Sequence, residues 1–190
     1  VEAIRMAVNA GMDTLEHVPF RADGTIKYND QIVQDIVDNG LIVSLAMPAT
    51  WYRLTEADMR DTRTHPGHLW ETRYDTIRRM HAAGVKLVVS SDQGSTGTRI
   101  DELPLLAEFL VNDVGLPASD VIYGMTGLSA EALGMEDQVG TLEPNKLADI
   151  VIVDGDPLAD IGTLKSVQKV IKDGQTVASD GAIILPPSKQ

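Results

Sequence analysis

The chain has 190 residues, 43% of them hydrophobic and 23% charged, which is typical of a folded, soluble protein with a core of its own. Its net charge of −12 argues against nucleic acids and anionic membranes as partners, and no apolar run approaches the roughly 20 residues that span a bilayer. The absence of cysteine excludes disulfides and thiolate ligands, so any metal must be bound by His, Asp, Glu or a modified side chain. We expect a cytoplasmic protein.

The first half of the chain alternates between helical and strand patterns. Apolar residues at helical spacing, ended by glycines, predict helices at residues 1–10, 29–39 and 69–83. Short runs rich in β-branched residues predict strands at residues 12–17, 41–45 and 87–90. This order predicts right-handed crossovers and a parallel sheet. Because the chain begins inside a helical pattern, we expect it to be a piece of a longer protein.

The strand predicted at 87–90 ends close to a carboxylate, Asp92, which Gly94 and a polar stretch follow. Proteins with parallel sheets place their chemistry at the carboxyl ends of the strands. Asp also often caps a turn or the next helix, and this strand alone favours that simpler interpretation.

A long polar segment, residues 49–68, separates the second strand from the third helix. Connections of this length are often functional lids or flexible insertions. Trp51 and Tyr52 could contact a substrate from such a lid, or could cover apolar surface. His65 and His68 could form a ligand pair, but a Pro-Gly pair between them breaks any regular spacing, so we interpret them as solvated loop residues.

The second half of the chain predicts shorter helices followed by consecutive strands. Three shorter helices are predicted at residues 101–111, 117–125 and 129–133. Four strands follow, at residues 149–153, 166–172, 175–177 and 182–185, and an Asp-Gly pair predicts a tight hairpin between the second and third of them. We therefore divide the chain into two domains, residues 1–138 and 139–190, the second small and antiparallel.

Four stretches resemble the metal-dependent amidohydrolase superfamily, and most closely its imidazolonepropionase-like and prolidase-like branch: residues 10–17, 90–94, 139–157 and 170–174. The first ends in Glu-His, and the second reads Ser-Ser-Asp-Gln-Gly. The third contains Gly-Thr-Leu-Glu-Pro-Asn-Lys-Leu-Ala-Asp-Ile-Val, where the family has Gly-Thr-Leu/Ile-Glu-x-Gly-Lys-x-Ala-Asp-Leu/Ile-Val. Asn145 replaces the usual Gly, which is a mild departure because Asn tolerates the left-handed backbone.

The resemblance implies an α/β fold, the C-terminal part of a (β/α)8 TIM-like barrel with a flanking β-sandwich. Residues 1–138 would form strands six to eight of the barrel, and residues 139–190 the C-terminal part of the sandwich. The family's other usual metal ligands are a His-x-His pair on the first strand, a carboxylated Lys or a Glu on the fourth and a His on the fifth. They have no counterpart here.

The resemblance also assigns the site to His17 and Asp92. Asp92 would bind a divalent metal, most commonly zinc, and act as the base toward the attacking water before it passes the proton to the leaving nitrogen. His17 would bind a second metal ion, or donate to the substrate or orient the hydroxide. The sequence does not choose between these roles.

Other polar residues have simpler interpretations. Glu16 alternates with His17 along the strand, so we expect it to pack or to form a salt bridge. His81 lies near a helix C-terminus, where a positive charge is favourable. Structural or turn roles are expected for four residues of the second domain: Lys146, Asp149, Asp154 and Asp156.

Two functions follow. The first is the C-terminal portion of a metal-dependent amidohydrolase, which cleaves a C–N bond in a cyclic amide, an amide or an Xaa-Pro dipeptide, with a small-molecule substrate. The second is a non-catalytic fragment or assembly module, because two protein ligands are fewer than the three that a catalytic zinc needs. A partial barrel also leaves unpaired edges, so we expect a homo-oligomer or a missing N-terminal half.

Overall fold

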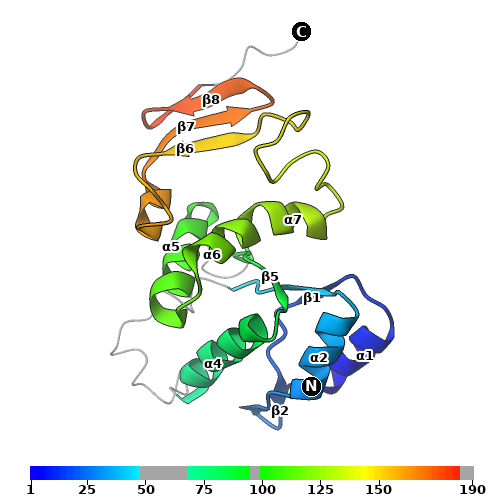
Figure 1. Ribbon diagram of the computed structural model, residues 1–190. Helices are drawn as coiled ribbons and strands as arrows, with labels where there is room; N and C mark the ends of the chain where they lie inside the picture. The colour runs from blue at the N-terminus through cyan, green and yellow to red at the C-terminus, as the bar shows by residue number, and fades with distance from the viewer. Residues whose placement is uncertain (48–67, 95–98, 185–190) are drawn as a thin grey trace.

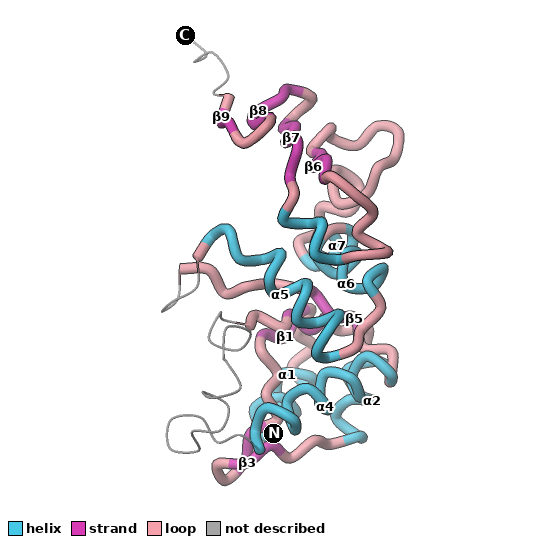
Figure 2. Tube along the Cα trace, turned by 90° about the vertical axis from the view of Figure 1, so that its left-hand side faces the viewer, coloured by secondary structure: helices cyan, strands magenta, loops and turns pink. Residues whose placement is uncertain are grey.

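The computed structural model describes residues 1–47, 68–94 and 99–184, which fold into an α/β part and a C-terminal antiparallel sheet (Figure 1). Helices α5, α6 and α7 lie between the parallel sheet and the C-terminal sheet, and α1 and β8 lie at opposite ends of the described part (Figure 2). No helix among these residues is both long and apolar enough to cross a membrane.

A three-stranded parallel sheet forms the centre of the first part. Strands β1 (Thr14–Glu16), β4 (Ile42–Ser44) and β5 (Lys86–Val88) pair in the order β1-β4-β5. The pairing aligns Glu16 with Ser44 and Ser44 with Val88. The parallel sheet predicted from the sequence is confirmed, and all three strands end at the same edge.

Helices connect and cover these strands. Helix α1 (Glu2–Asn9) precedes β1, a small hairpin of β2 (Arg21–Ala22) and β3 (Thr25–Ile26) follows it, and α2 (Asp30–Asp38) and α4 (His68–Ala82) precede β4 and β5. Helix α2 begins where the sequence predicts, because the Asn29 side chain accepts a hydrogen bond of 2.9 Å from the Ile32 amide.

The core lies between the sheet and these helices. One face of the sheet contributes Leu15, Val43 and Leu87, which pack with Ile36 of α2 and Ile77 of α4. On the opposite face the apolar contact is smaller, formed by Ile42, Val88 and Leu128. The carboxyl-terminal part of that opposite face carries polar side chains.

Three helical segments and a C-terminal sheet complete the fold. The helix predicted at 101–111 is divided into the 3-10 helix η2 (Ile100–Glu102), α5 (Leu103–Phe109) and the π-helix η3 (Leu110–Val114). Helices α6 (Ala118–Met125) and α7 (Gly127–Ala132) follow. The remaining elements are β6 (Ile150–Val153), η4 (Ile161–Lys165), β7 (Val167–Lys172), β8 (Gln175–Ser179) and β9 (Ala182–Ile183). The last sheet is antiparallel, in the order β6-β7-β8-β9.

The hairpin predicted between β7 and β8 is confirmed. Asp173 and Gly174 both have positive φ, 51° and 74°, as the two-residue turn of this kind requires. The sheet contacts the α/β part through η4, whose Ile161 is buried and whose Lys165 Nζ lies 2.5 Å from Glu108 Oε1 of α5.

Candidate functional site

His17 and Asp92 lie at the carboxyl edge of the parallel sheet. His17 directly follows β1, and Asp92 is the fourth residue after β5. Because β4 lies between these two strands and neighbouring strands are about 5 Å apart, the strands that carry the two residues are separated by about 10 Å. His17 and Asp92 thus follow the two strands that flank β4.

Both residues have a left-handed backbone, which is rare for residues other than glycine. The φ angles are 64° at His17 and 52° at Asp92, and Val18 next to His17 has a φ of 34°. The His17 amide donates to the Ser44 carbonyl at 2.8 Å, so the strand pairing continues up to the turn. Such backbone strain is frequent at functional sites and persists only where surrounding contacts hold it.

Arg73 of α4 supplies contacts of this kind. Its Nη1 donates to the Val18 carbonyl at 2.8 Å and its Nη2 to the His17 carbonyl at 2.5 Å. The side chain is only 4% exposed, and burial, followed by repulsion from Arg21, lowers the pKa of the guanidinium to about 10. Sequence reasoning missed Arg73, although a charged residue on the same helix face as Ile77 and Met80 is a usable signal.

A pair of serines joins the ends of β4 and β5. The Ser44 and Ser90 hydroxyl oxygens are 2.7 Å apart, and Ser90 Oγ also accepts a hydrogen bond of 3.0 Å from the Ala46 amide. The Met47 amide donates to the Ser90 carbonyl at 3.0 Å. Ser90 therefore fixes the end of β4 relative to the segment that carries Asp92. No local sequence pattern predicts this pair.

Glu16 does not pack as predicted. It lies beside Ser44 in the strand register, its side chain is exposed, and it forms no ion pair with the residues that the structure describes. Because side chains alternate along a strand, Glu16 and Ser44 share the face of the sheet opposite to the main core.

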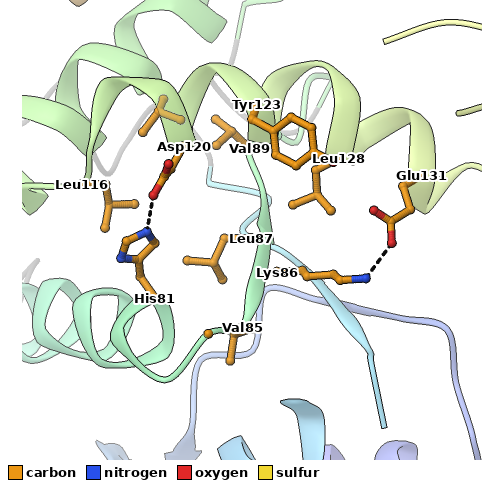
Figure 3. Close-up of a pocket in the computed structure, with 12 residues that line it drawn as sticks. His81, Val85, Lys86, Leu87, Val89, Leu116, Asp120, Tyr123, Leu128 and Glu131 are labelled. Carbon is orange, nitrogen blue, oxygen red and sulfur yellow. Dashed lines mark hydrogen bonds and ion pairs between the residues drawn. The ribbon is translucent and has the colours of Figure 1, made fainter. Parts of the chain in front are cut away.

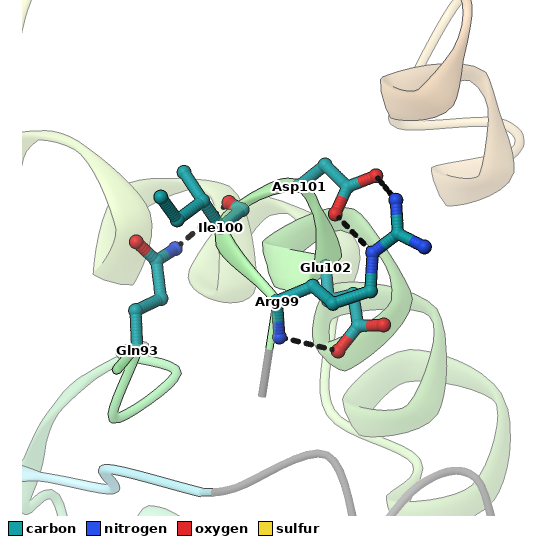
Figure 4. Close-up of polar contacts among 5 residues, drawn as sticks. All are labelled: Gln93, Arg99, Ile100, Asp101 and Glu102. Atoms are coloured by element: carbon teal, nitrogen blue, oxygen red, sulfur yellow. Dashed lines mark hydrogen bonds and ion pairs between the residues drawn. The ribbon is translucent and has the colours of Figure 1, made fainter. Parts of the chain in front are cut away.

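The segment after Asp92 is attached to η2 (Figure 4). Gln93 Nε2 donates to the Ile100 carbonyl at 3.0 Å, and the buried Glu102 carboxylate accepts a hydrogen bond of 3.0 Å from the Arg99 amide. Arg99 in turn pairs with Asp101 at 2.8 Å. Gln93 and Arg99 are thus each hydrogen-bonded to η2.

A cavity of about 190 Å³ lies beside His17. Polar groups come from His17, Arg21 and Arg73, and the end of β4 supplies apolar contacts through Leu45 and Met47. The cavity therefore combines two guanidinium groups with an apolar wall next to one of the predicted site residues.

The donors fit part of a metal site. An imidazole and a carboxylate are suitable ligands for zinc, but a catalytic zinc normally has three protein ligands. Within the described ranges, no group of three or more His, Asp or Glu side chains could hold a metal ion. His65, Trp51 and Tyr52 lie outside the described residues, as does the side chain of His68.

A second cavity, of about 270 Å³, lies at the amino end of β5, away from this edge (Figure 3). There His81 Nε2 lies 2.8 Å from Asp120 Oδ2, and Lys86 Nζ lies 2.6 Å from Glu131 Oε1. The structural interpretation of His81 is thus supported by its hydrogen-bonded contact with Asp120.

The polar residues of the second domain form local contacts. Asp149 accepts hydrogen bonds from Lys172 and from the Asp173 amide, Lys146 lies 3.2 Å from Glu143, and Asp156 accepts a hydrogen bond from the Leu158 amide. These contacts agree with the structural and turn roles predicted from the sequence.

Comparisons with known proteins identify relatives of the whole chain. The sequence profile described as "Amidohydrolase family" matches residues 2–177. The imidazolonepropionase of Geobacillus kaustophilus is 25% identical over 167 residues, which are 86% of this chain and 35% of that protein. A 5-methylthioadenosine/S-adenosylhomocysteine deaminase of Moorella thermoacetica is 34% identical over 85 residues, 41% of this chain and 20% of that protein.

Solved structures share the fold. A Xaa-Pro dipeptidase with bound methionine in its active site has a TM-score of 0.75 and 27% identity, covering 92% of this chain and 42% of that one. A putative prolidase from Bifidobacterium longum has a TM-score of 0.76 and 22% identity, covering 97% of this chain and 46% of that one. The chain thus spans less than half of these relatives. The assignment of residues 1–138 to barrel strands six to eight remains a prediction, as does the domain boundary after residue 138.

Proposed function

The chain belongs to the amidohydrolase family, and from that premise we propose that it supplies His17 and Asp92 to the active site of a metal-dependent hydrolase that cleaves a C–N bond. The substrate would be a cyclic amide, an amide or an Xaa-Pro dipeptide. The observation that carries this proposal is the position of both residues at one carboxyl edge, where proteins with parallel strands place their chemistry.

Each residue has a role that its chemistry supports. Asp92 accepts a proton from the attacking water and delivers it to the leaving nitrogen. His17 offers a ring nitrogen, either as a metal ligand or as a donor to the substrate. A bound divalent ion, such as zinc, would lower the pKa of a water ligand from about 15.7 toward about 7.

A second function is favoured by the small number of ligands. Because the described residues hold no group of three metal-binding side chains, the chain alone could be a non-catalytic fragment or an assembly module. Under the first proposal, the missing ligands would come from a second copy of the chain or from the rest of a longer protein.

Metal retention separates the two functions. We would load the purified chain with zinc, dialyse it extensively and measure zinc by elemental analysis in the wild type, Asp92→Asn and His17→Gln. The first proposal expects about one ion per chain in the wild type and a clear loss in both variants. Matched controls are Asp120→Asn and His81→Gln, which remove the same groups at the other end of β5.

The first proposal, with a second copy of the chain as the source of the missing ligands, fails if the wild type retains no zinc, and the chain alone is then non-catalytic. It also fails if the control variants lose as much zinc as the site variants, because binding would then be nonspecific. If zinc is retained through His17 and Asp92, hydrolysis of cyclic amides and Xaa-Pro dipeptides is the next measurement.

A further inference from the structure

The cavity beside His17 contains a buried positive charge. Arg73 is 4% exposed and lines this cavity, and it donates hydrogen bonds to two neutral carbonyl groups, those of His17 and Val18. Burial of a guanidinium without a nearby anion is costly.

Arg21 adds a second positive charge to the lining of this cavity. It lines the same cavity from strand β2, and neither arginine forms an ion pair with a carboxylate among the described residues. Two guanidinium groups thus meet at one cavity in a chain whose net charge is −12. Like charges placed together in this way are destabilising unless an anion binds between them.

The donors that remain suit a carboxylate. A guanidinium has five N–H donors in a planar fork, and the two carbonyl bonds of Arg73 use part of them. A carboxylate can accept two parallel N–H···O bonds from such a fork. The wall formed by Leu45, Met47 and Ile26 would contact an apolar group attached to the carboxylate.

We propose that this cavity binds a small organic carboxylate through Arg73 and Arg21, beside His17. Carboxylate binding follows from the cavity itself. Its assignment as the carboxylate of the hydrolysed substrate rests on the proposed function, and it places the bond to be cleaved on the His17 side of the cavity.

Titration of the metal-free chain with sodium propionate tests the proposal. Two-dimensional ¹H–¹⁵N NMR spectra, with the His17 and Arg73 signals assigned, would be followed at constant ionic strength with sodium chloride as the balancing salt. We expect saturable shifts at both residues. Arg21→Gln, a change at an exposed side chain, should weaken propionate binding by about tenfold.

The matched control is Arg5→Gln, which removes the same charge from an exposed position on α1. The proposal is overturned if propionate causes no saturable shift, if Arg5→Gln weakens binding as much as Arg21→Gln, or if inorganic phosphate binds more tightly than propionate. Arg73→Lys is a second variant, and its retention of wild-type affinity would also contradict the proposed bidentate contact.

This test is independent of the zinc measurement. Propionate binding that survives Asp92→Asn while zinc retention is lost would support both proposals as separate properties. Zinc retention through Asp92 without propionate binding would overturn the carboxylate site and leave the proposed function intact.

Discussion

Arg73 donates hydrogen bonds to two consecutive carbonyl oxygens, those of His17 and Val18, from the buried face of α4. Both acceptors belong to residues with positive φ, so the arginine stabilises the turn that places His17 at the sheet edge. This contact joins residues 55 and 56 positions apart, which is why no local pattern announces it.

We expect Arg73→Lys to lower the free energy of unfolding by about 1–3 kcal/mol, because an ammonium group does not reproduce both bonds of the fork. Urea unfolding followed by circular dichroism measures the change. Arg78→Lys is the control, since Arg78 lies on the same helix and also bonds two carbonyl groups, but is exposed. An equal loss in the two variants would show that burial at Arg73 is unimportant.

The positions of His17 and Asp92 after strands were predicted correctly from the sequence. The composition of a strand and the polar residue that follows the strand are both local properties of the sequence. Their left-handed backbone and the Ser44–Ser90 pair were not predictable. The serines are 46 residues apart and meet only because β4 and β5 pair in one register.

At the scale of elements, α6 lies against the free edge of β5. The Val89 amide donates to the Gly124 carbonyl at 3.1 Å, and a Cβ at Gly124 would lie 2.7 Å from the Leu87 carbonyl oxygen and 2.9 Å from Val89 Cγ2. The absence of a side chain at this position therefore permits the helix to approach the strand.

Gly124→Ala should therefore lower the free energy of unfolding by about 1–3 kcal/mol, although alanine favours helices more than glycine does. Chemical denaturation would measure it. Ser119→Ala, an exposed change on the same helix, should stay within about 0.5 kcal/mol of the wild type. A neutral or stabilising Gly124→Ala would mean that α6 moves away at no cost.

The β7–β8 hairpin gives a pH-dependent test. Hydrogen bonds from Lys172 and from the Asp173 amide hold the pKa of Asp149 below its usual value. Because the folded-state pKa is the lower one, the stabilisation is present above the unfolded pKa of about 3.9 and is lost as the pH falls through the folded-state pKa.

Asp149→Asn should therefore destabilise the chain at neutral pH and have a smaller effect in acid. Unfolding of the two proteins at pH of about 7 and about 2.5, at low salt, provides the comparison. Asp154→Asn, in the exposed loop after β6, serves as the control and should not reproduce this pH dependence. A difference that does not change with pH would refute the assigned contacts.

Element prediction succeeded where capping and turn residues act locally, as at Asn29 and at Asp173-Gly174. Residues 101–111 are helical as predicted, but their division between η2, α5 and the π-helix η3 was not predicted. This π-helix follows the end of α5, and its residues Leu110 and Val114 are buried in the core. That tertiary packing is not visible in a local sequence pattern.

For the whole molecule, the C-terminal sheet leaves apolar side chains in contact with solvent: Val151, Ile152, Val167 and Ile183. Exposed apolar groups and terminal strands of a sheet favour association with another chain. The homo-oligomer expected from the sequence is therefore our proposal for this surface, with a second copy as the partner.

Sedimentation equilibrium over an about hundredfold range of protein concentration would measure the association. Ile183, 82% exposed on the terminal strand β9, is the position to change, and Ile183→Asp should shift the equilibrium toward the monomer because a carboxylate is costly to bury in an apolar contact. Met6→Asp, at an exposed apolar residue of α1, should leave the equilibrium unchanged. If the wild type is a monomer throughout, the sheet does not pair copies of this chain, and a second copy does not supply the missing ligands of the site.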